Sequence, residues 1–216
     1  MEHQLKTVKT GRVFVEGDIQ TASLVFIALH GYAQLANGFI QEFKPVIRPG
    51  IAVVAPEGLH RFYRKGFYGD VVASWMTKED RETEIKDQSN YINAVLNDCG
   101  IDPKDPSVNF IVLGFSQGTS TAVRWFANNG IRPSQLVLWA GSFPHDVNAV
   151  EKHQIFNELP VHFVYGNEDP FLKGINVEEK TSEFEKMGMQ LKVWSFAGKH
   201  VMNKPTLAKI VDSFDS

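Results

Sequence analysis

A serine between two glycines stands in the stretch VLGFSQGTST, residues 112–121. Gly114, Ser116 and Gly118 are spaced as Gly-x-Ser-x-Gly, directly after the apolar run VNFIVL and directly before QGTSTAVRWFANN, whose composition favours a helix. Such a serine can act as a nucleophile, because a sharp turn from a buried strand into a helix exposes its hydroxyl. The alternative is an ordinary strand-to-helix turn that uses small residues for packing. The strand-then-helix context favours the nucleophile.

A serine hydroxyl needs a general base, and the base needs an acid that orients it. After a nucleophile on this kind of turn, the acid comes next along the chain and the histidine comes last. Of the seven histidines, His200 lies in the loop FAGKHVMN just past the last apolar run, and it is the best candidate for the base. His162 lies inside an apolar run, so we expect it to be packed in the core.

The candidate acid ends the segment PVHFVYGNED. We favour Asp169, because it comes last in the turn and Pro170 stiffens its backbone. Glu168 is the second choice. Asp146, which follows the preceding apolar run, is a weaker alternative. The non-catalytic interpretation of Asp169 is a side chain that forms a turn before a proline.

An ester carbonyl attacked by serine develops a negative charge, which two backbone N–H groups can stabilise. The N–H of Gln117 is one candidate, because Gln117 follows the nucleophile at the start of a helix. The N–H of Tyr32, in the loop LHGYAQ, is the other. We expect His30 to hydrogen-bond within this loop, since it precedes the serine and is out of order for a catalytic base.

The elements that must position these residues follow from apolar runs. Runs without polar alternation predict strands covered on both faces, as in a parallel sheet. They are SLVFIALHG (23–31), IAVVAPEG (51–58), VNFIVLGFSQG (108–118), QLVLWAGS (135–142) and PVHFVYGNED (160–169); LKVWSFAG (191–198) alternates more and is expected nearer an edge. A small hairpin is predicted over 5–17, with Gly11 near its turn.

Amphipathic segments between these runs predict helices over 78–100, 117–130, 175–188 and 203–214. For the first of them, Thr77 is the expected N-cap and Gly100 the expected end. Strands alternate with helices through most of the chain, which predicts an α/β fold with a mainly parallel sheet. No repeat or linker interrupts the pattern, so we expect a single domain over residues 1–216.

Composition excludes several classes of function. Hydrophobic residues make up 43% and charged residues 22%, and the formal net charge is −3, with no basic stripe that would suit nucleic acid. Cys99 is the only cysteine, and neither it nor the histidines have the spacing of metal ligands. The N-terminal residues are polar and the apolar runs are far shorter than a membrane span, so we expect a cytoplasmic protein.

Together these motifs resemble one known family. The segments LHGYAQ (29–34), GFSQG (114–118), YGNED (165–169) and GKH (198–200) are similar to the phospholipase/carboxylesterase group of α/β-hydrolases, which includes the acyl-protein thioesterases. The resemblance spans nearly the whole chain. It implies an α/β-hydrolase fold with helices on both faces of the sheet, a triad of Ser116, Asp169 and His200, and an oxyanion hole formed by the N–H groups of Tyr32 and Gln117.

Two positions depart from that family's pattern. Thr119 stands where the family has a second glycine after the glutamine, and Tyr165 stands where the acid loop usually has a histidine. The segment PEGLHRFYRKGFYGDVVASWM is also unlike the thioesterases. These departures concern the substrate, because no candidate triad residue is replaced.

The substrate site is expected to be open. Residues 141–159 leave no room for a cap domain between two strands, which suits small soluble esters. We expect the loop 56–76 to form the pocket wall, because aromatic side chains can hold an acyl or aryl group. Its basic residues, Arg61, Arg64 and Lys65, could favour an acidic substrate, although charges on a loop are usually solvated. The predicted substrate-binding residues are Phe62, Tyr63, Phe67, Tyr68, Trp75 and Phe143.

The sequence therefore predicts a serine hydrolase that cleaves carboxylic esters or thioesters through an acyl-enzyme, without a metal or another cofactor. We expect a monomer or a homodimer. One alternative is a protein of this fold that binds a ligand without catalysis. Another is a peptidase or lactone hydrolase, which would use the same triad.

Overall fold

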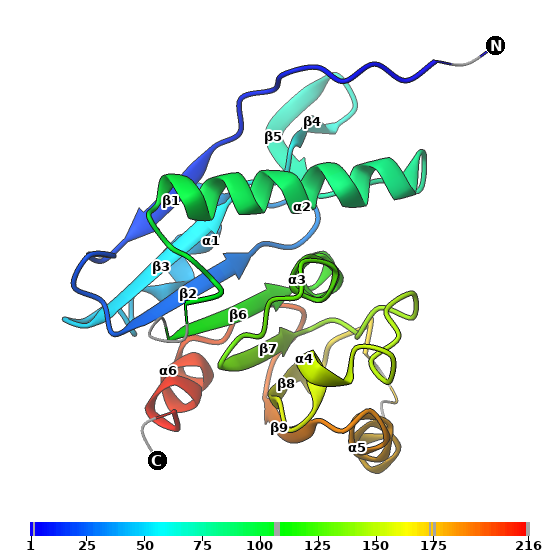
Figure 1. Ribbon diagram of the computed structural model, residues 1–216. Helices are drawn as coiled ribbons and strands as arrows, with labels where there is room; N and C mark the ends of the chain where they lie inside the picture. The colour runs from blue at the N-terminus through cyan, green and yellow to red at the C-terminus, as the bar shows by residue number, and fades with distance from the viewer. Residues whose placement is uncertain (2, 106–108, 173, 175, 215–216) are drawn as a thin grey trace.

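The computed structural model describes residues 1, 3–105, 109–172, 174 and 176–214, and its main feature is a seven-stranded sheet (Figure 1). The strand order is β1-β3-β2-β6-β7-β8-β9, and β1 alone runs antiparallel to its neighbour. The bounds are β1 Val13–Glu16, β2 Leu24–Leu29, β3 Ile51–Pro56, β6 Phe110–Phe115, β7 Gln135–Trp139, β8 Pro160–Gly166 and β9 Gln190–Phe196. The predicted parallel sheet is confirmed, and β9 is an edge strand as expected.

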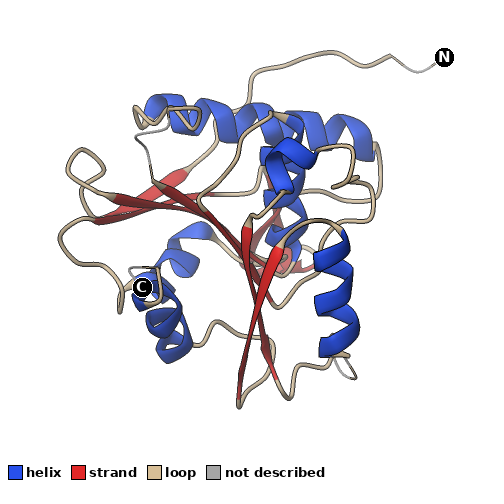
Figure 2. Ribbon diagram, turned by 60° about the horizontal axis from the view of Figure 1, so that its bottom comes forward, coloured by secondary structure: helices blue, strands red, loops and turns tan. Residues whose placement is uncertain are grey.

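Helices cover both faces of the sheet, as Figure 2 shows, because alternate residues of each central strand point to opposite sides. Along β2, Ile27 and Leu29 join one hydrophobic cluster, whereas Phe26 and Ala28 join the other. The first cluster packs against α2 Arg81–Asp98, α3 Gln117–Asn128, α4 His153–Phe156 and α5 Val177–Lys186. The second packs against α1 Ala36–Phe39, the 3₁₀ helix η1 Ile40–Phe43 and α6 Lys204–Asp212. The four predicted helices are confirmed; Val108 and Ile175, which begin two predicted segments, lie outside the described residues.

Two local predictions about helix α2 had different outcomes. Gly100 follows the helix with a φ of +69°, a conformation that favours glycine, so the expected end is confirmed. Thr77 is not the N-cap: the helix begins at Arg81 after Asp80, whose φ is +46°. The Thr77 hydroxyl instead accepts a hydrogen bond from the N–H of Glu79 and forms a turn ahead of the helix.

The predicted hairpin over 5–17 is wrong. Only β1 forms a strand there, and it pairs with β3 rather than with the segment before it. A buried apolar strand is a better partner than the polar residues that precede β1, and Arg12 continues the pairing by accepting the N–H of Glu57.

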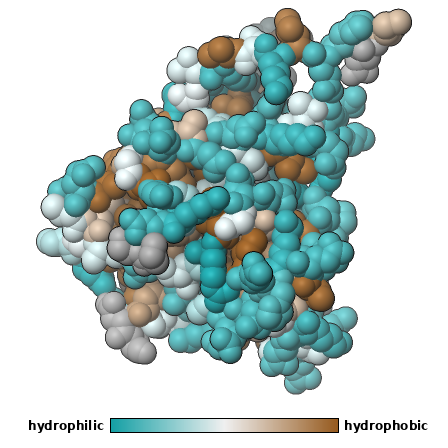
Figure 3. Space-filling model, in the orientation of Figure 1, coloured by the Kyte–Doolittle hydropathy of each residue, from teal (hydrophilic) through white to brown (hydrophobic). Residues whose placement is uncertain are grey.

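The segment 56–76 is a β-hairpin rather than a loop. Strands β4 His60–Lys65 and β5 Tyr68–Ser74 form a separate two-stranded antiparallel sheet, which projects at the top of Figure 1. Gly66, with a φ of +66°, lies in its turn. Phe67 is 88% exposed at the tip, and Figure 3 shows hydrophobic surface at the top of the molecule, where the hairpin lies.

Between β7 and β8, the described residues form turns and the short helix α4, with no cap. Among the residues that the structure describes, no helix combines the length and apolar character that crossing a membrane requires.

Candidate active site

Ser116 lies on a strained turn between β6 and α3. Its φ of 53° and ψ of −115° are rarely adopted by a residue with a side chain, so surrounding contacts must hold it there. Its N–H donates to the carbonyl of Trp139 at 2.8 Å, and its own carbonyl accepts the N–H of Thr119 at 3.0 Å. The turn therefore presents the Ser116 side chain at the carboxyl end of the sheet, directly before the first turn of a helix.

The two glycines of the motif allow the strand and helix to cross closely. A Cβ at Gly114 would lie 2.4 Å from the carbonyl oxygen of Gly118. A Cβ at Gly118 would lie 2.1 Å from the carbonyl oxygen of Leu29, at the end of β2. Both obstacles are backbone atoms, which cannot move without displacing the sheet. The motif is thus required by packing as well as by exposure of the serine.

A Gly118→Ala variant is expected to lose about 3 kcal/mol of unfolding free energy through overpacking, or roughly 6–12 °C in melting temperature. Gly38→Ala is the matched control, because Gly38 lies in helix α1 and a Cβ there would meet nothing within 4 Å. Thermal unfolding followed by circular dichroism compares the two. Equal melting temperatures for the Gly118→Ala and Gly38→Ala variants would show that the close approach of the backbone does not exclude a side chain at position 118.

The structure brings Ser116, His200 and Asp169 together in one hydrogen-bonded chain. His200 Nε2 lies 2.9 Å from Ser116 Oγ, and His200 Nδ1 lies 2.6 Å from Asp169 Oδ2. Asp169 is 1% exposed, and its other oxygen accepts the N–H of Phe171 at 2.9 Å. An ionised carboxylate only accepts, so Nδ1 carries the proton and Nε2 is left to accept from the serine hydroxyl. This is the arrangement that serine activation requires.

The two alternative acids lie elsewhere. Glu168 is exposed at the surface, and the hydrogen bonds of the described residues pair His200 with Asp169 and not with Glu168. Asp146 pairs with Arg124 at 2.9 Å and with Arg81 at 2.7 Å. Burial opposes the charge of Asp146, but the hydrogen bonds from Arg124 and Arg81 outweigh it and hold its pKa well below the usual range. Asp146 therefore joins α2 and α3 to the loop after β7.

The loop after β2 packs against this turn. A Cβ at Gly31 would lie 2.8 Å from the ring of Phe115, and the Gly31 N–H donates to Gln34 Oε1 at 2.7 Å. Among the described residues, the backbone N–H groups of Tyr32 and Gln117 have no hydrogen-bond acceptor. Both expected oxyanion donors are thus free in the two segments that meet beside Ser116.

His30 is fully buried and hydrogen-bonds within its loop, as expected. Its Nδ1 lies 2.8 Å from the carbonyl of Gly31, and its Nε2 accepts the N–H of Gly58 at 2.9 Å. These partners fix a neutral ring with the proton on Nδ1. Burial lowers the pKa of His30 to about 4, against the smaller opposing effects of its hydrogen bond to Gly31 and of Glu57.

His162 is the second buried histidine, as the sequence predicts. It is 5% exposed, accepts from the Trp194 indole at 3.0 Å and lies 3.0 Å from Gln135 Oε1. Burial, reinforced by the positive charge of Lys192, lowers the pKa of His162 to about 4.

These two histidines predict a loss of stability in mild acid. Above the ordinary pKa of 6.5, both are neutral in the folded and unfolded states; as pH falls from 6.5 toward 4, only the unfolded chain takes up the protons. The unfolding free energy should fall by about 3 kcal/mol for each histidine across that window. Urea unfolding at about pH 7.5 and about pH 4.5 measures this loss. His162→Gln should reduce it, and His145→Gln, at an exposed histidine, should not; equal losses in both variants would contradict the assignment.

The side chain of Gln117 has a structural role that the sequence did not reveal. Its Oε1 accepts the N–H of Trp75 at 3.1 Å, and its Nε2 donates to the carbonyl of Met76 at 2.9 Å. Gln117 therefore ties the first turn of α3 to the end of β5. The sequence assigned this residue only a backbone N–H, because its side-chain partners are some 40 positions away.

Thr119 also acquires an explanation. It is fully buried, and its hydroxyl donates to the carbonyl of Ser116 at 2.7 Å, with the carbonyl of Ser142 at 3.2 Å. Gly141 makes room for it, since a Cβ there would lie 2.4 Å from the Thr119 hydroxyl. Thr119 thus holds the strained Ser116 backbone and the loop after β7 together.

The predicted substrate-binding residues separate into three groups. Phe62, Tyr63, Phe67 and Tyr68 lie on the projecting hairpin, and the ring of Phe62 packs at a tilt against that of Tyr32, with ring centroids 5.5 Å apart. Trp75 does not line a pocket, because it is fully buried beneath His30 and donates to the His30 carbonyl at 2.7 Å. Phe143 packs edge-to-face on Phe156 and Phe184.

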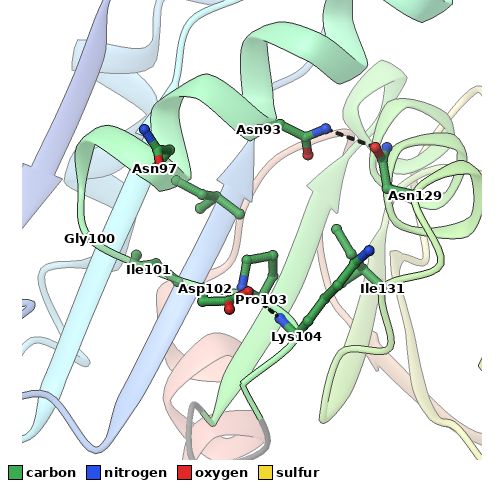
Figure 4. Close-up of a pocket in the computed structure, with 10 residues that line it drawn as sticks. Asn93, Asn97, Gly100, Ile101, Asp102, Pro103, Lys104, Asn129 and Ile131 are labelled. Atoms are coloured by element: carbon green, nitrogen blue, oxygen red, sulfur yellow. Dashed lines mark hydrogen bonds between the residues drawn. The ribbon is translucent and has the colours of Figure 1, made fainter.

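A separate pocket of about 480 Å³ lies at the opposite end of α3 from Ser116, lined by residues of α2, the loop after α2 and the turn after α3 (Figure 4). Asn93 and Asn129 are hydrogen-bonded at 2.8 Å beside it. None of the candidate site residues contributes to its walls.

No group of three or more metal-binding side chains occurs within the described part of the chain.

Comparison with known proteins agrees with this architecture. Residues 10–214 match the model of the phospholipase/carboxylesterase family. Among solved structures, the Bacillus cereus carboxylesterase has a TM-score of 0.68 at 16% identity, covering 95% of this chain and 93% of that one. Zea mays acyl-protein thioesterase 2 has a TM-score of 0.64 at 17% identity, covering 95% and 98%. A phospholipase/carboxylesterase from Dyadobacter fermentans has a TM-score of 0.63 at 17% identity, covering 98% and 99%. These similarities show a shared fold. A search of curated proteins gives no match.

Proposed function

This chain belongs to the phospholipase/carboxylesterase family of α/β-hydrolases, and we propose that it is a serine esterase acting on carboxylic esters or thioesters of small soluble compounds. One observation carries the proposal: a serine on a strained turn with a φ of 53° lies 2.9 Å from a histidine that is itself 2.6 Å from a buried carboxylate. A packing turn of small residues would not need the histidine or the acid.

In the proposed reaction, Ser116 attacks the ester carbonyl while His200 Nε2 takes the serine proton. Asp169 orients the imidazole and stabilises the imidazolium. The free N–H groups of Tyr32 and Gln117 donate to the negatively charged oxygen of the tetrahedral intermediate. His200 then gives its proton to the departing alcohol or thiol, which leaves an acyl-enzyme that water hydrolyses through the same residues.

The absence of a cap between β7 and β8 in the described chain supports an open site and small substrates. The basic residues of the hairpin give little support for an acidic substrate. Arg64 donates to the carbonyl of Ala33 at 3.0 Å, and Arg61 lies 3.9 Å from the buried carboxylate of Glu57. Both contacts fasten the hairpin to the domain, so these arginines already have structural partners.

A substrate panel tests the proposal. Short p-nitrophenyl esters and acyl thioesters should be hydrolysed faster than lactones and far faster than peptides, because p-nitrophenolate and thiolates are better leaving groups than the alkoxide of a lactone or the amine of a peptide. Faster turnover of peptides or lactones would identify a peptidase or a lactone hydrolase. No turnover of any member would favour a binding protein of this fold.

A further inference from the structure

An exposed phenylalanine, Phe171, stands beside the candidate base. Its ring meets the His200 ring edge-to-face, with centroids 4.8 Å apart and an interplanar angle of 64°. The side chain is 77% exposed, and among the described residues its ring contacts no aromatic ring except His200. A single exposed apolar side chain needs no explanation by itself, but one fixed against a catalytic base does.

The backbone holds Phe171 in that place. Its N–H donates to Asp169 Oδ1 at 2.9 Å, the carboxylate whose other oxygen meets His200. The carbonyl of Asp169 accepts the N–H of Leu172 at 3.2 Å, and the N–H of Asp169 donates to Gly166 at 3.0 Å. The turn that fixes the acid therefore also fixes the exposed ring.

A second phenylalanine already supports the imidazole. Phe115 is 3% exposed and its ring lies 5.1 Å from that of His200. Phe115 therefore already packs against His200 from the core. Most of the surface of Phe171 stays exposed and is free for another contact.

The mechanism of the reaction indicates which part of the substrate lies beside Phe171. The oxygen of the departing alcohol must approach His200 Nε2 to within hydrogen-bonding distance, because that atom returns the proton. Nε2 is part of the ring that Phe171 touches. The group attached to the departing oxygen therefore passes beside Phe171, whereas the acyl group lies on the other side of the reacting carbon.

We infer that Phe171 is a specificity-determining residue that binds the alcohol portion of the ester and favours apolar, above all phenyl-bearing, alcohols. The inference rests on the proposed function and adds the class of alcohol. Aromatic pairs gain stabilisation from edge-to-face contact beyond the area they bury, so a phenyl group should gain more than an alkyl chain of similar length.

The test uses two butyrate esters whose alcohols have similar acidity, 2-phenylethyl butyrate and ethyl butyrate. The measured quantity is the ratio of their kcat/KM values. Phe171→Ala should lower this ratio by about tenfold, and Phe171→Leu by about threefold, since an apolar contact is removed wholly or in part. Ethyl hexanoate against ethyl acetate gives the matching acyl ratio, which both variants should leave unchanged.

A ratio of wild-type size in both variants would overturn the inference, as would a shift in the acyl ratio instead of the alcohol ratio. A loss that is equal for every ester would show that Phe171 only supports His200, and it would also overturn the inference. If the wild type hydrolyses none of these esters, the proposed function fails first and the inference fails with it.

Discussion

Replacing Ser116 by alanine is expected to lower kcat/KM for a short p-nitrophenyl ester by about 10⁶-fold, the scale seen when the nucleophile of a serine triad is removed. The methyl group cannot form the acyl-enzyme, and His200 loses the hydroxyl at 2.9 Å. The residual hydrolysis would come from direct attack of water on the bound ester, with the oxyanion donors still stabilising the negative charge. Steady-state release of p-nitrophenolate measures the loss.

Ser120→Ala is the matched control, because Ser120 lies one helical turn further along α3 and only its distant contact to Ser142, at 3.5 Å, is lost. It should stay within a few-fold of the wild type. If Ser116→Ala retained most of the activity while folding normally, the nucleophile would be another group.

Replacing Asp169 by asparagine should lower kcat by about 10⁴-fold with little change in fold, because an amide can hold the imidazole in the wrong tautomer. The carboxylate accepts the His200 Nδ1 proton at 2.6 Å, whereas an amide NH₂ group in that position would donate to Nδ1. The proton would then move to Nε2, which could no longer accept from Ser116. Single-turnover kinetics with a p-nitrophenyl ester separate this effect from substrate binding.

Asp146→Asn separates the two candidate acids. It should keep kcat within a few-fold but lower the melting temperature, because Arg124 and Arg81 would lose their shared carboxylate. The reverse outcome, with activity lost at Asp146 and kept at Asp169, would assign the acid to the loop after β7.

Much of the fold could be predicted because the central strands are nearly continuous apolar runs, buried on both faces. One error arose because a strand pairs with a partner that is distant in sequence. The hairpin over 5–17 failed because β1 pairs with β3, some 40 residues away. The hairpin β4–β5 pairs locally, and the prediction of a loop over 56–76 was wrong although a glycine turn flanked by aromatic residues is a strand signal.

The candidate site also contains residues that the sequence could predict and contacts that it could not. Ser116, Asp169 and His200 could be selected because chain order and position after strands are properties of the sequence. The contacts of the Gln117 side chain, the Thr119 hydroxyl and Phe171 could not, because each depends on how separate loops meet. The prediction that Trp75 binds substrate was wrong, because an aromatic residue near a site in sequence can equally be buried beneath that site.

Labelling by a fluorophosphonate probe, followed by mass spectrometry of the digested protein, tests the central claim most directly. The account predicts one covalent adduct in the wild type, on the peptide that carries Ser116, and none in Ser116→Ala. No adduct on the folded wild type, or undiminished labelling of Ser116→Ala, would contradict it.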